Sequence, residues 1–535
     1  MNKLFYGDNL SVLRESIANE SVDLIYLDPP FNSNASYNVL FKAPSGEGSQ
    51  AQIEAFEDSW HWNESAERAF DEVVTGPHSD ASIMLKAMRS ALGENDMMAY
   101  LAMMAVRLIE LHRVLKRTGA LYLHCDPTAS HYLKIILDGV FGTQNYINEI
   151  IWRRYTRPKG SQFKARSFGT STDTILFYSK TDEYSFNLDR IKTSLDDDEI
   201  KKRYNLTDKN GPYYSGPLLR SAAMGDRPNL VYEYKGFTPG PEGWRMTKEK
   251  VAALDAAGDM FFTSSGIPRR KVRMGDDPGT TIDNLWTNIE ALGAHAAERL
   301  GYPTQKPLAL LERIVSASSN EGDLVLDPFC GCGTTIHAAH KLNRKWIGID
   351  ITHLAIALIE RRLKEAFSDI TYEVHGVPKD VAGARDLAER DKHEFQKWIT
   401  ATIGAQPYKG GKKGMDRGID GYLHFRDVDK KPQFAIVSVK GGENITSGMV
   451  RDLKGTMDRE KAALGLFLTL NEPTREMEKE AASAGLYETG GMKVPRLQIL
   501  TAAQILDNRS PQVPFGFTEG FKKAAREEKD QDRLL

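Results

Sequence analysis

The sequence has few cysteines, no long apolar run and almost no net charge, and each absence excludes a class of protein. Three cysteines in 535 residues cannot form a disulfide framework, which favours a reducing, cytoplasmic setting. The chain has no apolar run of about 18 residues and no secretory signal core, so we expect no membrane segment. The net charge of −3 excludes a uniformly basic protein, so nucleic acid would have to be bound through local patches.

The composition is that of an ordinary folded protein. Hydrophobic residues make up 41% and charged residues 27%, a balance that argues against wholesale disorder. At about 150 residues per domain, the length predicts three or four domains. Cys330 and Cys332 form a C-x-C pair, but no second pair with zinc-finger spacing exists, so we interpret both as packing residues.

The first segment alternates strands and helices and contains a short acidic motif. The apolar run from Val22 to Leu27 predicts a buried strand. Two prolines follow and cannot continue a central strand, so the chain must turn at the strand end where open α/β sheets bind ligands. The motif at this turn is Asp28, Pro29, Pro30 and Phe31. Helices near 100–115 and 128–140, with strands near 120–124 and 174–178, predict a doubly wound, mainly parallel sheet.

The Asp-Pro-Pro-Phe motif has the chemistry to bind an exocyclic amino group. The prolines fix a loop in which the Asp28 carboxylate and a backbone carbonyl can both accept hydrogen bonds from one amine. Phe31 offers a ring on which a base can stack, and stacking is worth about 1–3 kcal/mol per base. That energy offsets much of the cost of unstacking a flipped nucleotide. The alternative explanation is a rigid turn that contains an acidic residue.

A second strand–turn–helix unit predicts a nucleotide site. The strand over 324–327 leads into a glycine-rich turn and a helix start, where the candidate binding residues are Asp327, Pro328, Phe329, Gly331, Gly333, Thr334 and Thr335. The next strand ends in Asp350, placed to bind ribose hydroxyls. Ile336 occupies the third glycine position of a dinucleotide fingerprint, which favours a nucleoside such as S-adenosylmethionine.

Just upstream, a proline-bounded motif precedes a predicted helix over 308–316. Its residues are Thr304, Gln305, Lys306 and Pro307. The helix terminus and the Lys306 ammonium could together hold a carboxylate. The alternative is an ordinary helix start.

In this order, the motifs resemble the beta class of the DNA amino-methyltransferases. The resemblance implies a circularly permuted, Rossmann-like fold with a catalytic half over 1–180, a target-recognition insert over 181–300 and a cofactor half over 301–370. It further implies that Asp8 lies near the adenine of S-adenosylmethionine, and that the methyl group passes directly to an amine of double-stranded DNA.

The target base is inferred from Asp28. The resemblance favours the 6-amino group of adenine, because cytosine 4-amino members more often carry serine at that position. A cytosine 4-amino methyltransferase stays the alternative. Covalent catalysis at cytosine carbon 5 would need a cysteine, and the motif has none. RNA or protein-amide targets are less favoured, because such relatives more often carry Asn-Pro-Pro-Tyr.

Two basic clusters predict phosphate contacts on this slightly acidic chain. The first comprises Arg153, Arg154, Arg157, Lys159, Lys164 and Arg166, and the second comprises Arg269, Arg270 and Lys271, followed by Arg273. Solvated basic loops are the alternative explanation. The sequence leaves the recognised site, the oligomeric state and any partner subunit open.

After a predicted linker over 371–392, residues 393–508 resemble the Mrr-like branch of restriction-endonuclease folds, an α/β architecture. The resemblance implies that Asp420 and Lys440 belong to a site that holds a divalent metal such as Mg²⁺ and activates water, with Glu394 as a helix acid. Ser438 stands where the family has an acid or glutamine, and a hydroxyl is a weak ligand for a hard cation. Glu443 or Glu460 could replace it.

Two functions of the C-terminal domain therefore stay open. One is a nuclease, which would make the chain a combined restriction–modification enzyme. The other is a DNA-binding or regulatory relic. A binding protein without any turnover is disfavoured by the intact motifs of the first domain. Residues 509–535 are expected to form a solvated tail or a docking helix.

Overall fold

The computed structural model describes residues 1–30, 37–39, 53–56, 62–156, 168–192, 197–273, 281–293, 296–300, 302, 304–408, 418–427, 432–514 and 524–527. They form two compact units, Leu188–Asp283 and the remainder, Met1–Asn187 with Asn284–Leu535. Phe31, Arg157, Lys159, Lys164 and Arg166 lie outside the described residues.

A nine-stranded sheet forms the centre of the larger unit, in the order β12-β6-β7-β5-β2-β13-β14-β1-β15. The strands are β1 (Lys3–Tyr6), β2 (Val22–Leu27), β5 (Leu115–Cys125), β6 (Tyr146–Arg153), β7 (Thr172–Ser179), β12 (Leu285–Trp286), β13 (Leu324–Asp327), β14 (Lys345–Asp350) and β15 (Glu373–His375). Only β7 runs antiparallel to its neighbours β5 and β6. The predicted doubly wound, mainly parallel sheet is therefore confirmed.

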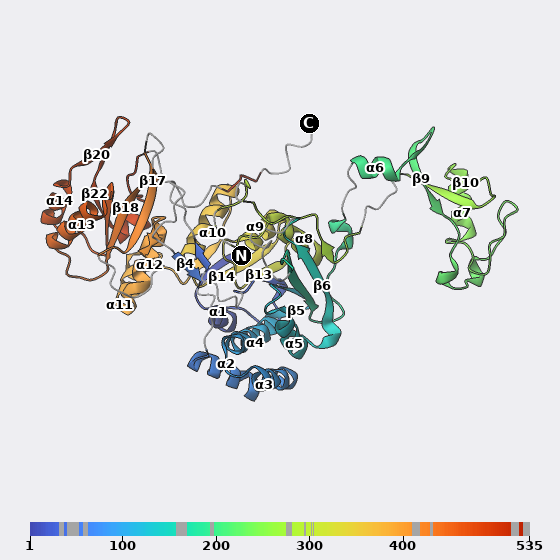
Figure 1. The fold of residues 1–535 in the computed structure, drawn as a ribbon, viewed down its shortest axis with the longest axis horizontal. Helices are drawn as coiled ribbons and strands as arrows, with labels where there is room; N and C mark the ends of the chain where they lie inside the picture. Colours follow the sequence, from blue (N-terminus) through green and yellow to red (C-terminus); the bar gives the residue numbers. More distant parts are fainter. Residues whose placement is uncertain are drawn as a thin grey trace. The chain divides into compact units, whose positions relative to one another are not determined.

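Helices cover both faces of this sheet (Figure 1). One face carries α1 (Asn9–Ser16), α4 (Asp96–Val114) and α5 (Ser130–Phe141), with α2 (Glu64–Thr75) and α3 (Ser79–Leu92) outside them. The other face carries α8 (Leu308–Ser318), α9 (Thr334–Lys341) and α10 (His353–Ala366). A strand covered on both sides must be apolar on both sides, which explains the continuous apolar run of β2. A short separate pair is formed by β3 (Tyr37–Val39) and β4 (Ile53–Phe56).

The two halves of the motif set meet in the middle of the sheet. Strand β2 pairs in parallel with β13, so the segments that follow Leu27 and Asp327 leave the same edge side by side. Strand β13 also pairs with β14, and β14 with β1. Four loops far apart in the sequence therefore converge at one edge of the sheet, where ligands bind in open α/β folds.

The smaller unit, Leu188–Asp283, lies within the predicted insert 181–300 but is shorter. Its sheet has the order β10-β11-β9-β8. Its elements are α6 (Asp197–Arg203), β8 (Leu206–Asp208), β9 (Gly211–Pro217), α7 (Lys248–Ala256), β10 (Met260–Phe262) and β11 (Pro268–Arg273). The unit is shorter than predicted because Asn187 bonds to Ala317 and β12 pairs with β6, which places both segments with the larger unit.

The C-terminal domain is a second α/β layer structure with the sheet order β16-β17-β18-β19-β22. Its strands are β16 (Gln406–Pro407), β17 (Gly421–Arg426), β18 (Pro432–Lys440), β19 (Leu464–Thr469) and β22 (Leu497–Thr501), with a hairpin of β20 (Leu486–Thr489) and β21 (Met492–Pro495). Its helices are α12 (Lys392–Thr402), α13 (Ser447–Glu460), α14 (Arg475–Ala482) and α15 (Ala502–Leu506).

The prediction of a linker over 371–392 is wrong. Strand β15 extends the large sheet by pairing with β1, and α11 (Val381–Arg390) buries Ala384 and Leu387 in the C-terminal core. The charged composition that suggested a linker belongs to the exposed face of α11. The described part of the tail contacts α9 and α10, where Glu527 accepts from His337 at 2.8 Å.

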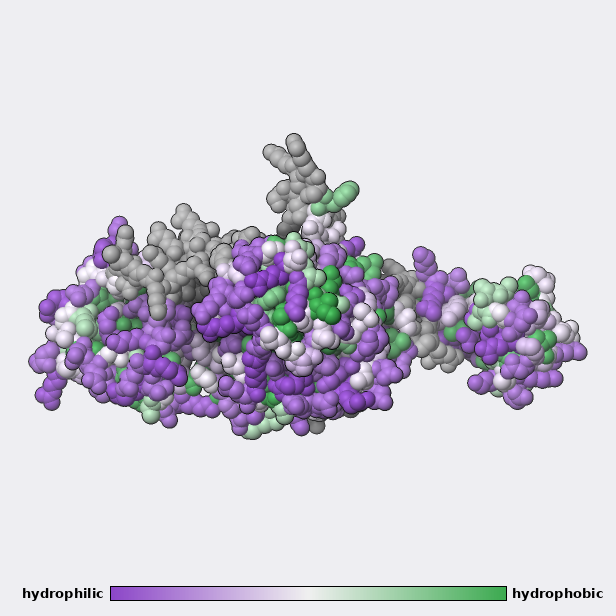
Figure 2. All heavy atoms as spheres, turned by 90° about the horizontal axis from the view of Figure 1, so that it is seen from below, coloured by the Kyte–Doolittle hydropathy of each residue, from purple (hydrophilic) through white to green (hydrophobic). Residues whose placement is uncertain are grey.

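The face of the molecule drawn in Figure 2 is mainly polar, and hydrophilic residues cover most of it. Among the residues that the structure describes, we found no helix with the length and apolar character needed to cross a bilayer.

Candidate active site

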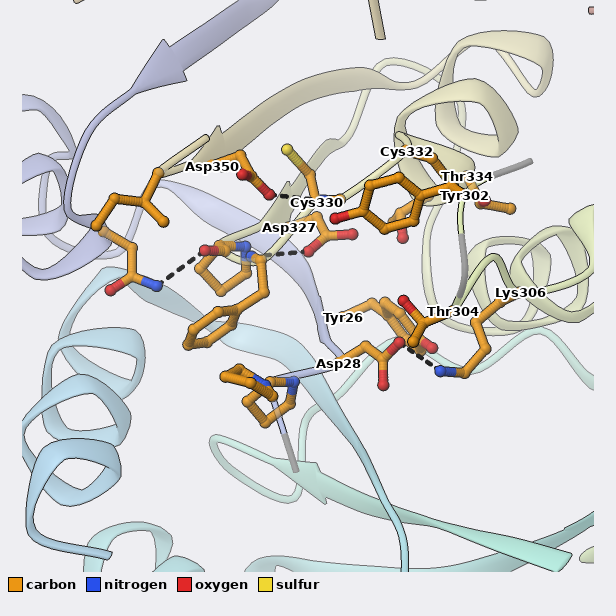
Figure 3. Close-up of a pocket in the computed structure, with 18 of the residues that line it drawn as sticks. Tyr26, Asp28, Tyr302, Thr304, Lys306, Asp327, Cys330, Cys332, Thr334 and Asp350 are labelled. Carbon is orange, nitrogen blue, oxygen red and sulfur yellow. Dashed lines mark hydrogen bonds and ion pairs between the residues drawn. The ribbon is translucent and has the colours of Figure 1, made fainter. Parts of the chain in front are cut away.

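A pocket lies where the ends of β1, β2, β13 and β14 converge, and it brings together most of the predicted site residues (Figure 3). Its lining includes Asp8, Asp28, Pro29, Pro30, Thr304, Gln305, Lys306, Asp327, Pro328, Phe329, Gly331, Thr334, Thr335 and Asp350. Gly333, which was also predicted, is not part of this lining. Asp28 and Lys306 occupy one end of the pocket and Asp350 the other.

The glycine turn shapes the Asp350 end. Gly331 and Gly333 adopt positive φ angles of 50° and 74°, which glycine tolerates best. A Cβ added at Gly333 would lie 2.8 Å from a side-chain carbon of Ile359, so α9 can begin there only with glycine. The Gly331 amide donates to Asp350 Oδ2 at 2.9 Å, which ties the turn to the carboxylate at the end of β14.

Asp350 is held in a fixed orientation. Its Oδ1 accepts from the amide and the hydroxyl of Thr352 at 2.9 and 2.8 Å. Burial raises the pKa of Asp350, and these hydrogen bonds act in the opposite direction. The carboxylate is thus a rigid acceptor that faces the pocket, as a hydroxyl-bearing ligand requires.

Asp327 is a second buried carboxyl group in the pocket. It is 3% exposed, and its Oδ1 accepts from the Phe329 amide at 3.0 Å. Burial raises the pKa of Asp327 to about 7. A carboxyl group with this pKa changes its charge near neutral pH, in the centre of the pocket.

Lys306 and Asp28 form an ion pair at one end of the pocket. The pair joins the proline loop to the residues before α8. Lys306 binds Asp28 Oδ2. Asp28 Oδ1 takes part in no hydrogen bond with the residues that the structure describes, so it is available to a ligand.

Arg107 is a site residue that sequence reasoning missed. It is 7% exposed and donates to Asp8 Oδ1 and Asn9 Oδ1, both at 2.6 Å. Asn9 in turn donates to the Pro328 carbonyl at 2.9 Å. Burial lowers the pKa of Arg107, while Asp8 works to raise it. A lone arginine in the apolar face of a helix was the available signal, because buried arginines are rare unless paired.

A buried polar chain supports the Asp28 loop and was also missed. Tyr26 lines the pocket, and its hydroxyl lies 2.9 Å from His124 Nδ1. His124 Nε2 lies 3.1 Å from Asp173, which forms an ion pair with Arg154 at 3.2 Å. Burial works to raise the pKa of Asp173, but the His124 hydrogen bond and the nearby cations outweigh it and lower that pKa. Arg154 therefore has an internal role.

The second basic cluster is largely occupied within its own unit. Lys271 and Arg273 bind Asp208 at 2.6 and 2.9 Å, and their hydrogen bonds lower its pKa. Arg269 donates to Ser215 at 2.9 Å, whereas Arg270 Nε is buried without a hydrogen-bond partner among the described residues. These bonds favour a structural explanation for this cluster. In the first cluster, Arg153 Nε is buried without a hydrogen-bond partner among the described residues.

In the C-terminal domain, the structure separates Glu394 from the other predicted residues. Asp420 Oδ1 accepts from Gln396 at 2.7 Å, and its Oδ2 accepts from the Val439 amide at 2.6 Å. Glu394 instead accepts from Tyr6 and lies 3.5 Å from His353. The prediction of Glu394 as the helix acid beside Asp420 was therefore wrong. At about 100° per residue, positions 394 and 396 point to opposite sides of α12.

The remaining acid candidates do not complete a metal site. Glu460 pairs with Arg459 at 2.9 Å. Glu443 is absent from the lining of the pocket beside Lys440. Within the described parts of the chain, no cluster of three or more His, Cys, Asp or Glu side chains could hold a metal ion. The residues around Asp420 do not fit Mg²⁺, which prefers several carboxylate and carbonyl oxygens.

The doubly wound sheet, the glycine turn tied to Asp350 and the Asp-Pro-Pro loop define a nucleotide-binding protein of the Rossmann-like class. A family model described as DNA methylase matches residues 22–361, more than half of the chain. The chain therefore belongs to this family and is an S-adenosylmethionine-dependent DNA methyltransferase. A second family model, described as restriction endonuclease, matches residues 387–489.

Two sequence relatives agree with the family. The chain is 32% identical to the type II methyltransferase M.EcaI of Enterobacter cloacae over 401 residues, which cover 74% of this chain and 76% of that protein. It is 26% identical over 361 residues to the StyLTI Mod subunit of a type III restriction-modification enzyme of Salmonella typhimurium. The match covers 64% of this chain and 50% of that subunit. A solved structure of TTHA0409 from Thermus thermophilus, complexed with S-adenosyl-L-methionine, is 16% identical with a TM-score of 0.35, covering 71% of this chain and 100% of that one.

Proposed function

We propose that this methyltransferase transfers a methyl group to the 6-amino group of adenine at specific sites in double-stranded DNA. The observation that supports adenine is the Asp28 carboxylate, which Lys306 holds at one oxygen while the other faces the pocket. The similarity to M.EcaI and to the StyLTI Mod subunit supports a restriction–modification setting.

The pocket residues fit S-adenosylmethionine, which would supply an electrophilic methyl group. Asp350 would accept hydrogen bonds from two ribose hydroxyls, because Thr352 and Gly331 fix its orientation. Asp8, fixed by Arg107, would face the adenine of the cofactor. Thr304, Gln305 and Lys306 belong to the lining of the same pocket and would limit how the cofactor sits.

Asp28 would receive the target amine. Its Oδ1 and a carbonyl of the proline loop would accept the two N–H groups, which directs the nitrogen lone pair toward the methyl carbon. The N–C bond would form as the bond between the methyl carbon and the cofactor sulfur breaks, which leaves a neutral thioether. The methylated nitrogen then becomes acidic, and Asp28 is placed to take its proton. Lys306 would hold Asp28 in position, and Tyr26 with His124 would support the strand that carries it.

Expression in a bacterial host that lacks DNA methylation tests this proposal. Single-molecule sequencing of the host DNA should find N6-methyladenine at one short sequence motif. 4-Methylcytosine at a motif would overturn the choice of base, and methylation scattered without a motif would overturn site specificity. Because the proposed reaction uses no metal, EDTA should leave methylation by the purified protein unchanged.

A further inference from the structure

The C-terminal domain has a pocket of its own, which methyl transfer does not use. It is bounded by α12, by the end of β18 and by the glycine turn that follows. The polar side chains in its lining are Lys392, Gln396, Lys440 and Asn444, and no acidic residue belongs to the described lining. Lys392 and Gln396 are four residues apart on α12 and therefore share one face of the helix.

The charge of this pocket suits an anion. The ammonium groups of Lys392 and Lys440 make no hydrogen bond or ion pair with any residue in the described part of the chain. At Gly442 an added Cβ would meet nothing within 4 Å, so the turn beside Lys440 leaves room for a ligand. Two cations that have no partner among the described residues, beside an open turn, form a site for phosphate oxygens.

Gln396 in the lining, together with Ser438 and Asp420 outside it, argues against a metal ion. Gln396 and Ser438 are neutral, and Asp420 behind them already accepts from an amide side chain and a backbone amide. A divalent cation would have one carboxylate here, and it would have to displace both of these donors. We therefore derive no hydrolytic step from this domain.

We propose that the pocket binds phosphate groups of the double-stranded DNA backbone without a metal ion, so that the C-terminal domain is a second DNA-binding site of the chain. The proposal rests on the DNA substrate of the family and is independent of which base is methylated. Free phosphate shares the chemistry of the backbone phosphate, so the test must separate the two.

Fluorescence anisotropy of the full chain on a labelled duplex, in EDTA, provides the test. The double variant Lys392→Ala/Lys440→Ala should bind several-fold more weakly. The slope of log affinity against log salt should become shallower by about two, because two phosphate contacts are lost. Lys479→Ala, which removes an exposed lysine of α14, is the matched control and should change neither quantity. Unchanged affinity and slope in the double variant would overturn the proposal.

Two further measurements separate the alternatives. Inorganic phosphate should displace the duplex only at concentrations at which any salt of equal ionic strength displaces it. Displacement at micromolar phosphate would instead assign the site to a free anion. Gln396→Glu/Ser438→Glu adds two negative charges and should weaken duplex binding in EDTA, so tighter binding would count against the site. Magnesium-dependent plasmid cleavage that Asp420→Asn abolishes would also overturn the proposal.

Discussion

The Lys306 ammonium binds the Asp28 carboxylate, although 278 positions separate the two residues in the sequence. Both side chains are mostly buried, with 12% and 18% of each exposed. The contact links the motif that precedes α8 to the proline loop after β2. Lys306 is thus a positioning residue for the group that receives the amine.

Lys306→Met should lower kcat for methylation by about 100-fold, because Asp28 loses the partner that fixes its oxygen. A loss of about 100-fold is typical when an acid–base group is displaced. The KM for S-adenosylmethionine should change little. Lys306→Arg keeps the charge and should retain more activity than Lys306→Met. Steady-state kinetics with labelled cofactor measure both values, and a raised KM with unchanged kcat would show that Lys306 binds the cofactor carboxylate instead.

Asp350→Ala should weaken S-adenosylmethionine binding at least tenfold. Each hydrogen bond to a charged acceptor is worth about 1.5–3 kcal/mol, and about 1.4 kcal/mol corresponds to a factor of ten. The substitution also removes the acceptor of the Gly331 amide. Isothermal titration calorimetry measures the loss, with exposed Asp182→Ala as the control. An unchanged affinity would reject the ribose assignment.

Arg107→Met should destabilise the first domain by about 1–3 kcal/mol, because buried Asn9 and partly exposed Asp8 both lose their partner. Chemical denaturation measures the free energy of unfolding. Arg390→Ala removes an exposed arginine that lies 3.9 Å from Asp386, and such pairs contribute little. Equal effects of the two substitutions would contradict the structural role of Arg107.

Ionisation of Asp327 should lower the free energy of unfolding as the pH rises from about 4 to about 7. Its folded pKa is raised to about 7, so in this interval the folded protein binds more protons than the unfolded chain. Above that pH its contribution should be constant. Denaturation of wild type and Asp327→Asn at pH 5 and pH 8 tests the sign: the wild type should lose more stability than the variant, and the reverse order would contradict it.

The sheet and the pocket could be predicted because their signals are local. A buried strand that meets two prolines must end there. A glycine-rich turn, followed by a helix and a strand that ends in an acidic residue, is typical of a nucleotide-binding site. The Arg107–Asp8 and His124–Asp173 contacts could not be predicted, because the partners are brought together only by the packing of distant elements. The contact of Gln396 with Asp420 could have been predicted in part, because positions 394 and 396 point to opposite sides of α12 and only one of them can face Asp420.

Nucleoside mass spectrometry of unmethylated DNA, incubated with S-adenosylmethionine and either wild type or Asp28→Ala in the absence of magnesium, tests the central claim most directly. We expect 6-methyladenine with the wild type, none with the variant, and cofactor affinity of the variant within a few fold of the wild type. 4-Methylcytosine would keep the mechanism and overturn the base. Undiminished 6-methyladenine from Asp28→Ala, or loss of cofactor binding by that variant, would contradict the role of Asp28 in holding the target amine.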